Sequence, residues 1–328
     1  RIASTCAMAS ARSARVGNAL SASSFTTQPR DRVSPAQGSD WARSGRPAID
    51  AITNSDKGLS VIVGDSFDWQ DDNFTPPPKD QQIIYELHIG TFHRPDAATP
   101  GTFSSAIEKL DYLQQLGINM IELMPVTSMA YSYGWGYAPN YIYSVETVLG
   151  GRHGLLMFVR EAHKRGIGVI LDVVYNHFSG DTDLWQFDGW SENNRGGIYF
   201  YNDARGDTPW GGRPDYGRPE VRQFILDNIT MWLTDYRLDG LRIDSTIYMR
   251  NTEGHDHDPP HDIPDAWYLL QDIVNLAHKV NPRAIVIAED CANSAFITKR
   301  REDSGCGFDA QWELGFPHAV RDALDFMQ

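Results

Sequence analysis

The sequence predicts an α/β fold, a TIM-type (β/α)8 barrel that is incomplete and holds five to six strands. From about residue 82, short apolar segments alternate with amphipathic ones, which is the pattern of a parallel sheet with connecting helices. Polar residues follow the third, fourth and fifth of these apolar segments, which favours a barrel over a doubly wound open sheet. The absence of a glycine-rich phosphate loop after the first segment also weakens the open-sheet alternative.

The predicted elements follow from apolar runs and from the residues that bound them. The run at 169–174 is nearly continuously apolar, as expected for a strand buried on both faces. A capping-box spacing from Ser105 to Glu108 lies in a helix at 104–116, and Pro219 suits the first turn of a helix at 219–236. Further helices are expected at 155–165 and 264–280, an insertion at about 178–218, and strands at 83–87, 118–126, 169–174, 241–245, 284–288 and 308–312.

Residues 1–79 differ from the barrel region at 80–328 and form a low-complexity tail and linker. The first 30 residues lack acidic side chains and are rich in Ser, Ala and Arg, which suits either an organelle transit peptide or a disordered tail, and we favour the tail. A short strand is expected at 59–63, and the three prolines at 76–78 make a stiff linker.

Composition excludes some classes of binding partner and indicates the cellular compartment. A formal net charge of -14 argues against nucleic acid and anionic membranes, because phosphates would be repelled. No apolar run approaches the roughly 20 residues of a membrane-spanning helix. The three cysteines form no CxxC pair and make a poor disulfide framework, so we expect a cytoplasmic protein, with organelle targeting as the alternative.

Two carboxylates at the ends of neighbouring strands are the candidate catalytic pair. Arg242 and Asp244 are two residues apart on one strand, so they point the same way, and the guanidinium favours an ionised, nucleophilic Asp244. Glu289 ends the next strand after an apolar run, where partial desolvation favours the protonated form of a general acid. Adjacent parallel strands lie about 4.8 Å apart, close to the roughly 5 to 5.5 Å that a retaining glycosidase needs. The alternative for the Arg242–Asp244 pair is a structural salt bridge at a strand end. The alternative for Glu289 is a helix N-cap or a loop carboxylate.

Asp172 and His177 add polar groups at the exit of the third strand. His177 is placed to donate a hydrogen bond to a sugar hydroxyl, and Asp172 to orient its neighbours. A purely structural histidine is the alternative, but the shared barrel face favours substrate contact.

Three segments carry a resemblance to a known family: 172–177 (DVVYNH), 240–244 (GLRID) and the strand that ends in Glu289. They resemble conserved regions of the α-amylase superfamily, glycoside hydrolase family 13, over residues 82 to about 320. The resemblance implies a retaining barrel enzyme that acts on α-glucans without a cofactor. It implies that Asp244 is the nucleophile and Glu289 the general acid/base.

The resemblance also implies roles for the surrounding residues. Arg242 would orient the nucleophile, His177 would contact the sugar at the cleavage site, and Tyr137 would stack on that sugar. Asp172 would be a supporting residue, and Asn176 matches a position that binds calcium in some members of the family.

Finer motifs at 85–92, 135–139 and 185–190 resemble 1,4-α-glucan branching enzymes and maltooligosyltrehalose trehalohydrolases. Both groups usually carry a carbohydrate-binding β-sandwich before the barrel, and 67–69 with the proline linker resembles the end of such an arrangement. Branching is the favoured activity. Hydrolysis by the same machinery and a non-catalytic glucan-binding fragment are the alternatives.

The sequence departs from the family pattern after Glu289, where nothing matches the family's Asn-His-Asp strand end. Too few strands are present to close a barrel, so we expect a truncated chain that lacks turnover. The string His255-Asp-His-Asp258 is either a loose metal-binding loop or, as we favour, a solvated loop.

Overall fold

The structure is a computed structural model that describes residues 34–35, 50–51, 59–61, 66–70, 72–129, 134–180, 182, 184, 189–190, 197–313 and 315–326. The composition-based prediction for the first 30 residues lies outside this part of the chain. The short strand expected at 59–63 is observed as β3 (Leu59–Val61), which pairs antiparallel with β1 (Ser34–Pro35) and β2 (Asp50–Ala51).

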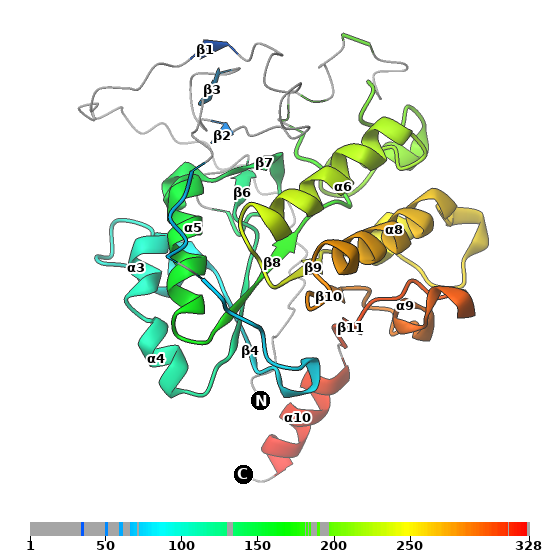
Figure 1. The fold of residues 1–328 in the computed structure, drawn as a ribbon. Coiled ribbons are helices and arrows are strands. Elements are labelled where there is room, and N and C mark those ends of the chain that lie inside the picture. Colours follow the sequence, from blue (N-terminus) through cyan, green and yellow to red (C-terminus); the bar gives the residue numbers. More distant parts are fainter. Residues whose placement is uncertain are drawn as a thin grey trace.

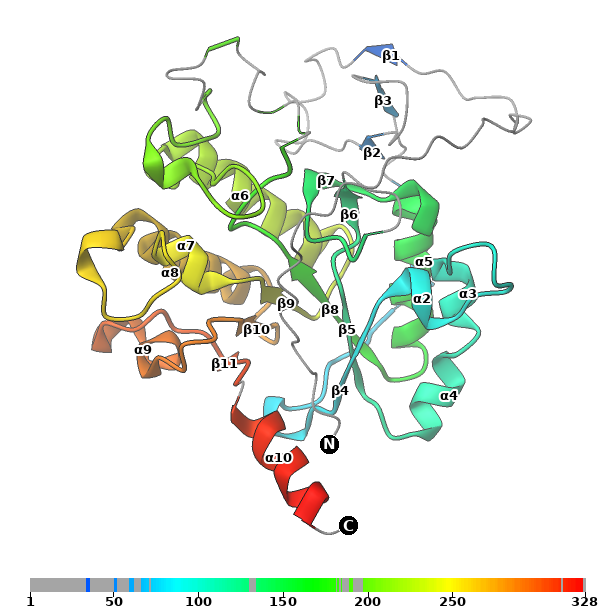
Figure 2. The same ribbon diagram turned by 180° about the vertical axis from the view of Figure 1, so that it is seen from behind.

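Six parallel strands form one curled sheet in the order β11-β10-β9-β8-β5-β4 (Figures 1 and 2). Neighbours in space follow the order in sequence, as in a barrel whose chain winds in one direction. The described residues therefore hold six of the eight strands that a closed barrel needs, and the predicted incomplete barrel is confirmed. The strands are β4 (Ile84–Leu87), β5 (Met120–Leu123), β8 (Gly168–Val173), β9 (Gly240–Ile243), β10 (Ile285–Ala288) and β11 (Ala310–Gln311).

Helices cover the outer face of this sheet. In Figure 1, α3 (Phe103–Ile107), α4 (Leu110–Gln115) and α5 (Gly151–His163) lie on one flank, and α6 (Pro219–Thr234) and α8 (Pro264–Val280) on the other. Both α6 and α8 begin at a proline, whose fixed φ and missing N–H suit the first helical turn.

The four central strands of the sheet are buried on both faces, whereas the edge strands β4 and β11 are partly exposed. Every residue of β8 is buried, as its continuous apolar run predicts. On the concave face a separate small cluster of Met120, Ile170, Ile285 and Ile287 fills the base of the barrel interior, and Trp312 packs against it. The larger cluster lies between the sheet and the outer helices and includes the fully buried Trp232 of α6.

The helix predicted at 104–116 is wrong in one respect, because it is two helices. Residues 108–109 are a turn between α3 and α4. The capping box also lies three residues earlier than predicted, with Thr102 as the N-cap. The Thr102 hydroxyl accepts from the Ser105 N–H at 3.3 Å, and the Ser105 hydroxyl accepts from the Thr102 N–H at 2.9 Å. Ser105 is thus the third helical residue and closes the capping box, but it is not the N-cap residue.

Shorter elements frame the end of the barrel where the strands terminate. An antiparallel pair, β6 (Thr127–Met129) and β7 (Pro139–Val145), lies between β5 and α5 in sequence and was not predicted. The remaining elements are α2 (Ile89–Phe92), α7 (Thr246–Arg250), α9 (Ala295–Thr298), and 3₁₀ turns at Lys79–Gln81, Thr147–Leu149, Ala204–Gly206, Pro259–His261 and Arg301–Asp303.

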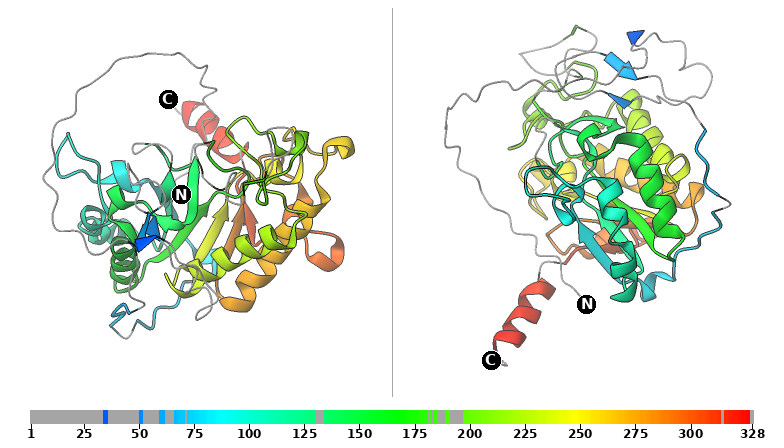
Figure 3. Two further views of the ribbon diagram at one scale, coloured as in Figure 1. Left: turned by 90° about the horizontal axis from the view of Figure 1, so that it is seen from above. Right: turned by 90° about the vertical axis from the view of Figure 1, so that its left-hand side faces the viewer.

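The final helix, α10 (Gly315–Phe326), extends away from the body of the molecule (Figure 3). None of its residues is buried. Among the described residues, the structure contains no helix with the length and apolar character needed to cross a membrane.

Candidate active site

The candidate catalytic residues lie at the carboxyl ends of β8, β9 and β10. Arg242 of β9 is in register with Asp172 of β8. Ala288 of β10 is in register with Ile243, so Asp244 and Glu289 directly follow paired positions on neighbouring strands. The Glu289 N–H donates to the Ile243 carbonyl at 3.0 Å, which extends the strand pairing up to the two acids.

Arg242 is the hub of the site, with one guanidinium that contacts three carboxyl groups. Nη1 donates to both oxygens of Asp172 at 2.8 Å and to Oδ1 of Asp244 at 2.7 Å. Nη2 lies 2.9 Å from Oε2 of Glu289. Burial alone would lower the pKa of Arg242, but the surrounding acids raise it well above its usual value, so the cation is permanent.

Burial favours the protonated form of two acids in this cluster. Burial raises the pKa of Asp172 to about 8, against the opposing effect of Arg242 and with the repulsion of Asp244 added. Burial likewise raises the pKa of Glu122 well above its usual range. One buried guanidinium cannot balance several ionised acids, and this favours the protonated forms of Asp172 and Glu122.

Glu122 is a member of the cluster that sequence analysis missed. This fully buried side chain of β5 has its Oε1 4.0 Å from Nε of Arg242. Within the described residues, Arg242 Nε has no hydrogen-bond partner, and Trp312 is, besides Arg242, a neighbour whose side chain favours the charged form of Glu122. The signal in the sequence is one acidic residue in the otherwise apolar segment 120–123, within the strand predicted at 118–126.

Glu289 is held on two sides. Besides its contact with Arg242, its Oε2 accepts from the backbone N–H of Ser245 at 3.0 Å. Ser245 follows Asp244 directly and has φ 45°, in the left-handed region that residues other than glycine rarely adopt. The turn after β9 therefore presents its N–H to the acid on β10.

Asn176, expected as a calcium position, contacts the candidate nucleophile. Its Nδ2 donates to Oδ2 of Asp244 at 2.6 Å and to the Asp244 carbonyl at 3.0 Å. Its Oδ1 contacts Nδ1 of His177. The described part of the chain contains no group of three His, Cys, Asp or Glu side chains that would hold a metal ion. In this structure the Asn176 amide orients Asp244.

Tyr137 and His177 lie beside the acids, as the resemblance implies. The Tyr137 hydroxyl donates to Oδ2 of Asp172 at 2.7 Å, and its ring lies 5.9 Å from the Arg242 guanidinium carbon. The preceding Gly136 has φ 93°, and a Cβ there would lie 2.3 Å from the Pro125 carbonyl oxygen, so only glycine fits this approach to Tyr137. His177 Nε2 donates to the Tyr137 carbonyl at 2.8 Å, and burial lowers the pKa of the His177 ring.

The His255–Asp258 string is a solvent-exposed loop. The side chains of His255 and His257 are 70% and 85% exposed. Asp256 lies 2.9 Å from Arg250, and Asp258 accepts from His261 at 2.7 Å. The acids of this loop therefore contact the side chains of Arg250 and His261, and the exposure of the two histidines fits a solvated loop.

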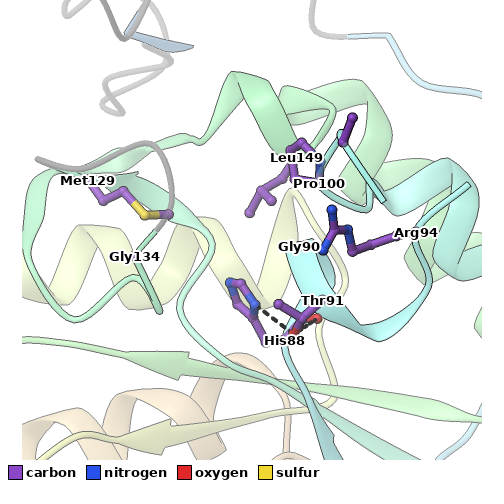
Figure 4. A pocket seen from close by; sticks show the side chains of 9 residues that line it. His88, Gly90, Thr91, Arg94, Pro100, Met129, Gly134 and Leu149 are labelled. Atoms are coloured by element: carbon purple, nitrogen blue, oxygen red, sulfur yellow. Dashed lines mark hydrogen bonds between the residues drawn. The ribbon is translucent and has the colours of Figure 1, made fainter. Parts of the chain in front are cut away.

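A separate pocket lies beside the carboxyl end of β4 (Figure 4). Its lining includes His88, Thr91, Arg94, Met129 and Leu149. The His88 Nδ1 lies 3.1 Å from the Thr91 hydroxyl, and Arg94 points along the same wall. None of the four clustered acids lines this pocket, so it is distinct from the Arg242 cluster.

Comparison with known proteins places this geometry in a family. Residues 86–210 match the family described as "Alpha amylase, catalytic domain". A malto-oligosyltrehalose trehalohydrolase from Saccharolobus solfataricus is 37% identical over 270 residues, which cover 81% of this chain and 43% of the relative. A 1,4-alpha-glucan branching enzyme from Leifsonia xyli is 31% identical over 312 residues, which cover 89% and 41%. A crystal structure of a protein assigned as an alpha amylase from Salmonella typhimurium superposes with a TM-score of 0.61 at 30% identity, covering 77% and 40%.

Fold and site together define a parallel barrel protein with carboxylates clustered at its strand ends. The chain belongs to the α-amylase superfamily, glycoside hydrolase family 13. It spans about two-fifths of the length of the curated relatives cited above, with 43% and 41% covered.

Proposed function

We propose that the chain carries the retaining catalytic machinery of an α-glucan-active enzyme. We further propose that, contrary to the expectation of a chain without turnover, this machinery is active, because the two acids and Arg242 are assembled within the described residues. The observation that carries this proposal is the shared contact of Asp244 and Glu289 with one guanidinium, from neighbouring strand ends, at 2.7 Å and 2.9 Å. A retaining glycosidase needs a nucleophile and an acid/base at such close quarters, whereas an inverting enzyme separates them by about 6.5 to 9.5 Å for a water.

In the proposed first step, protonated Glu289 gives its proton to the glycosidic oxygen while Asp244 attacks the anomeric carbon. The bond to the leaving sugar breaks, and Asp244 becomes a neutral glycosyl ester. Negative charge thus passes from Asp244 to Glu289. Both acids contact Arg242, one at Nη1 and one at Nη2, so the same cation stabilises the charge before and after the step.

In the second step, Glu289 removes a proton from the acceptor, whose oxygen attacks the glycosyl ester and frees Asp244. Asn176 keeps the Asp244 carboxylate in one orientation through its bond at 2.6 Å. Tyr137, His177, Asp172 and Arg242 surround the two acids, and we assign substrate contact to this group.

The acceptor decides between hydrolysis and transfer. The 37% identity to a trehalohydrolase, against 31% to a branching enzyme, favours water as the acceptor and a maltooligosaccharide or maltooligosyltrehalose as the substrate. Branching, in which a sugar 6-hydroxyl is the acceptor, is the second candidate, because the branching-enzyme match covers 89% of the chain. The motifs at 85–92 and 135–139 suit both.

Proton NMR of α-maltosyl fluoride hydrolysis tests the proposed stereochemistry, because the first sugar released must have the α configuration. Release of the β anomer would show inversion and contradict the proposal. Incubation with amylose, followed by a debranching enzyme and chain-length analysis, then separates the two acceptors. New α-1,6 branches would establish transfer, and released glucose or maltooligosaccharide without branches would establish hydrolysis. Binding of amylopectin without turnover of either substrate would favour the non-catalytic alternative.

A further inference from the structure

A second buried ion pair is formed by the residue that follows the candidate acid/base in the chain. Asp290 follows Glu289 in the chain and is fully buried, and Arg250 ends helix α7. Arg250 donates from Nε to Oδ2 of Asp290 at 2.9 Å and from Nη2 to Oδ1 at 2.7 Å. We propose that Arg250 and Asp290 are positioning residues that hold the acid/base Glu289 in its productive orientation. This inference rests on the proposed retaining function.

The connection runs through the turn that follows the nucleophile. The Thr246 N–H donates to the Glu289 carbonyl at 2.8 Å. The Thr246 hydroxyl donates to Oδ2 of Asp290 at 3.0 Å and lies 3.1 Å from the Glu289 carbonyl. Thr246 therefore touches both residues of the strand end, and its position is fixed by Asp290 as well as by Glu289.

Backbone strain at Ser245 explains why the turn needs this support. Ser245 has φ 45° and ψ 52°, a conformation that persists in a serine only when the surroundings hold it. That conformation aims the Ser245 N–H at Oε2 of Glu289, 3.0 Å away. If the turn relaxed, Glu289 would lose the hydrogen bond from the Ser245 N–H and would shift relative to the glycosidic oxygen.

The Asp290 carboxylate supplies the restraint. It binds the first and the last residue of α7, Thr246 and Arg250, and so presses this short helix against the end of β10. A five-residue helix has little stability of its own, so contacts outside the helix must hold it in place. The restraint acts on the turn and on Glu289, while Asp244 is held separately by Arg242 and Asn176.

The contacts of Asp290 with Arg250 and Thr246 form a clasp between α7 and the end of β10. Arg250 also connects this clasp to the exposed His255–Asp258 loop. Its Nη1 lies 2.9 Å from Oδ1 of Asp256, so one guanidinium fastens the loop on one side and Asp290 on the other. Replacement of Asp290 by asparagine leaves Arg250 with Asp256 as its remaining ion-pair partner among the described residues. Asp290→Asn therefore breaks the clasp with minimal change in side-chain volume.

The test compares two substrates that differ in their need for a general acid. Fluoride leaves α-maltosyl fluoride without protonation, whereas an unactivated maltopentaose requires a proton from Glu289. We expect Asp290→Asn to lower kcat/KM for maltopentaose at least about tenfold, within the range that general acid catalysis supplies. The value for α-maltosyl fluoride should change by less than about twofold, because Asp244 keeps its own partners. A merely structural role would lower both values alike.

Asp272→Asn is the matched control. Asp272 pairs with Arg222 at 2.6 Å on the more exposed surface of α8, far in sequence from the catalytic turn. This variant also loses an ion pair, but we expect it to leave the ratio of the two kcat/KM values unchanged. An equal loss on both substrates in Asp290→Asn, or no loss on maltopentaose, would overturn the positioning role.

Hydrogen exchange of the unliganded chain gives a readout that needs no turnover. Asp290→Asn should speed amide exchange in the peptide 243–250, whereas Asp272→Asn should not. Unchanged exchange in that peptide would contradict the clasp. If the wild-type chain turned over neither substrate, the proposed function would fail, and the exchange result would still decide whether Asp290 holds the turn.

Discussion

Both carboxyl oxygens of Asp172 lie 2.8 Å from the same terminal nitrogen of Arg242. Despite this contact, burial raises the pKa of Asp172 to about 8. The folded protein therefore keeps a proton on Asp172 between about pH 4 and pH 8, while the unfolded chain releases it. For this residue the unfolded state binds fewer protons, so its contribution to the free energy of unfolding falls as pH rises through that window.

The Asp172→Asn variant tests that linkage. Asparagine is neutral at every pH, so the variant should lose the decline in stability that Asp172 causes between about pH 4 and pH 8. The measurement is the melting temperature of both chains across this range, read as a difference curve. A difference that stays constant with pH would show that Asp172 is ionised in the folded protein.

For His163 the pKa is also raised, but here the charged form is the one that the folded protein stabilises. Its two ring nitrogens lie 2.6 Å from Asp72 and 2.9 Å from Asp239, in a buried contact that fastens the segment before the barrel to α5. Burial alone would lower the pKa of His163, but the hydrogen bonds and charges of Asp239 and Asp72 raise it. Its stabilisation is therefore complete below the unfolded pKa of about 6.5 and is lost as pH rises through the higher folded value.

His163→Gln should lower the free energy of unfolding by about 3 kcal/mol at pH 6, because two buried carboxylates lose their cation. The deficit should shrink as pH rises through the folded pKa. His261→Gln is the control, because its contact with Asp258 at 2.7 Å is half exposed and should contribute less than about 1 kcal/mol. Urea unfolding at several pH values checks both. Equal effects of the two substitutions would contradict a stabilising role of the buried contacts of His163 with Asp72 and Asp239.

Sequence reasoning reached the strands and the acids on them because both leave local patterns. The apolar run at 169–174 predicted β8 to within one residue at each end, and the two-residue spacing of Arg242 and Asp244 placed them on one face. Contacts between distant segments left no such pattern. The Arg250–Asp290 pair joins residues 40 apart in sequence. Glu122 on β5 approaches Arg242 on β9 across the intervening strand β8 of the curled sheet.

The error at the capping box has the same origin. Ser105 and Glu108 have the spacing of a capping box, but Thr102, three residues earlier, is the N-cap and accepts from the Ser105 N–H. The contact of the Asn176 amide with Asp244 likewise depends on the fold, because Asp244 lies 68 residues further along the chain. Local spacing cannot decide which of two chemically able residues takes a partner, because the fold sets that geometry.

Arg242→Lys should cause a large loss of activity with little loss of fold. An ammonium group is a compact point charge and cannot contact Asp172, Asp244 and Glu289 together, as the planar guanidinium does. We expect kcat for α-maltosyl fluoride to fall on the order of 100-fold, comparable to the removal of one preorganised donor. Arg222→Lys, which alters the partly exposed pair with Asp272, is the matched control and should leave kcat within about twofold. Similar rates for the two variants would remove Arg242 from the proposed role.

Trapping of the glycosyl-enzyme intermediate tests the assignment of Asp244 as nucleophile most directly. The reagent is 5-fluoro-α-D-glucopyranosyl fluoride, whose ring fluorine slows breakdown of the intermediate while its anomeric fluoride leaves without a proton. Intact-mass analysis followed by peptide mapping should find one glycosyl unit per chain, on the peptide that contains Asp244, and none in Asp244→Asn. A chain that gains no mass, or that carries the sugar on Glu289 or Asp172, would contradict the proposed mechanism.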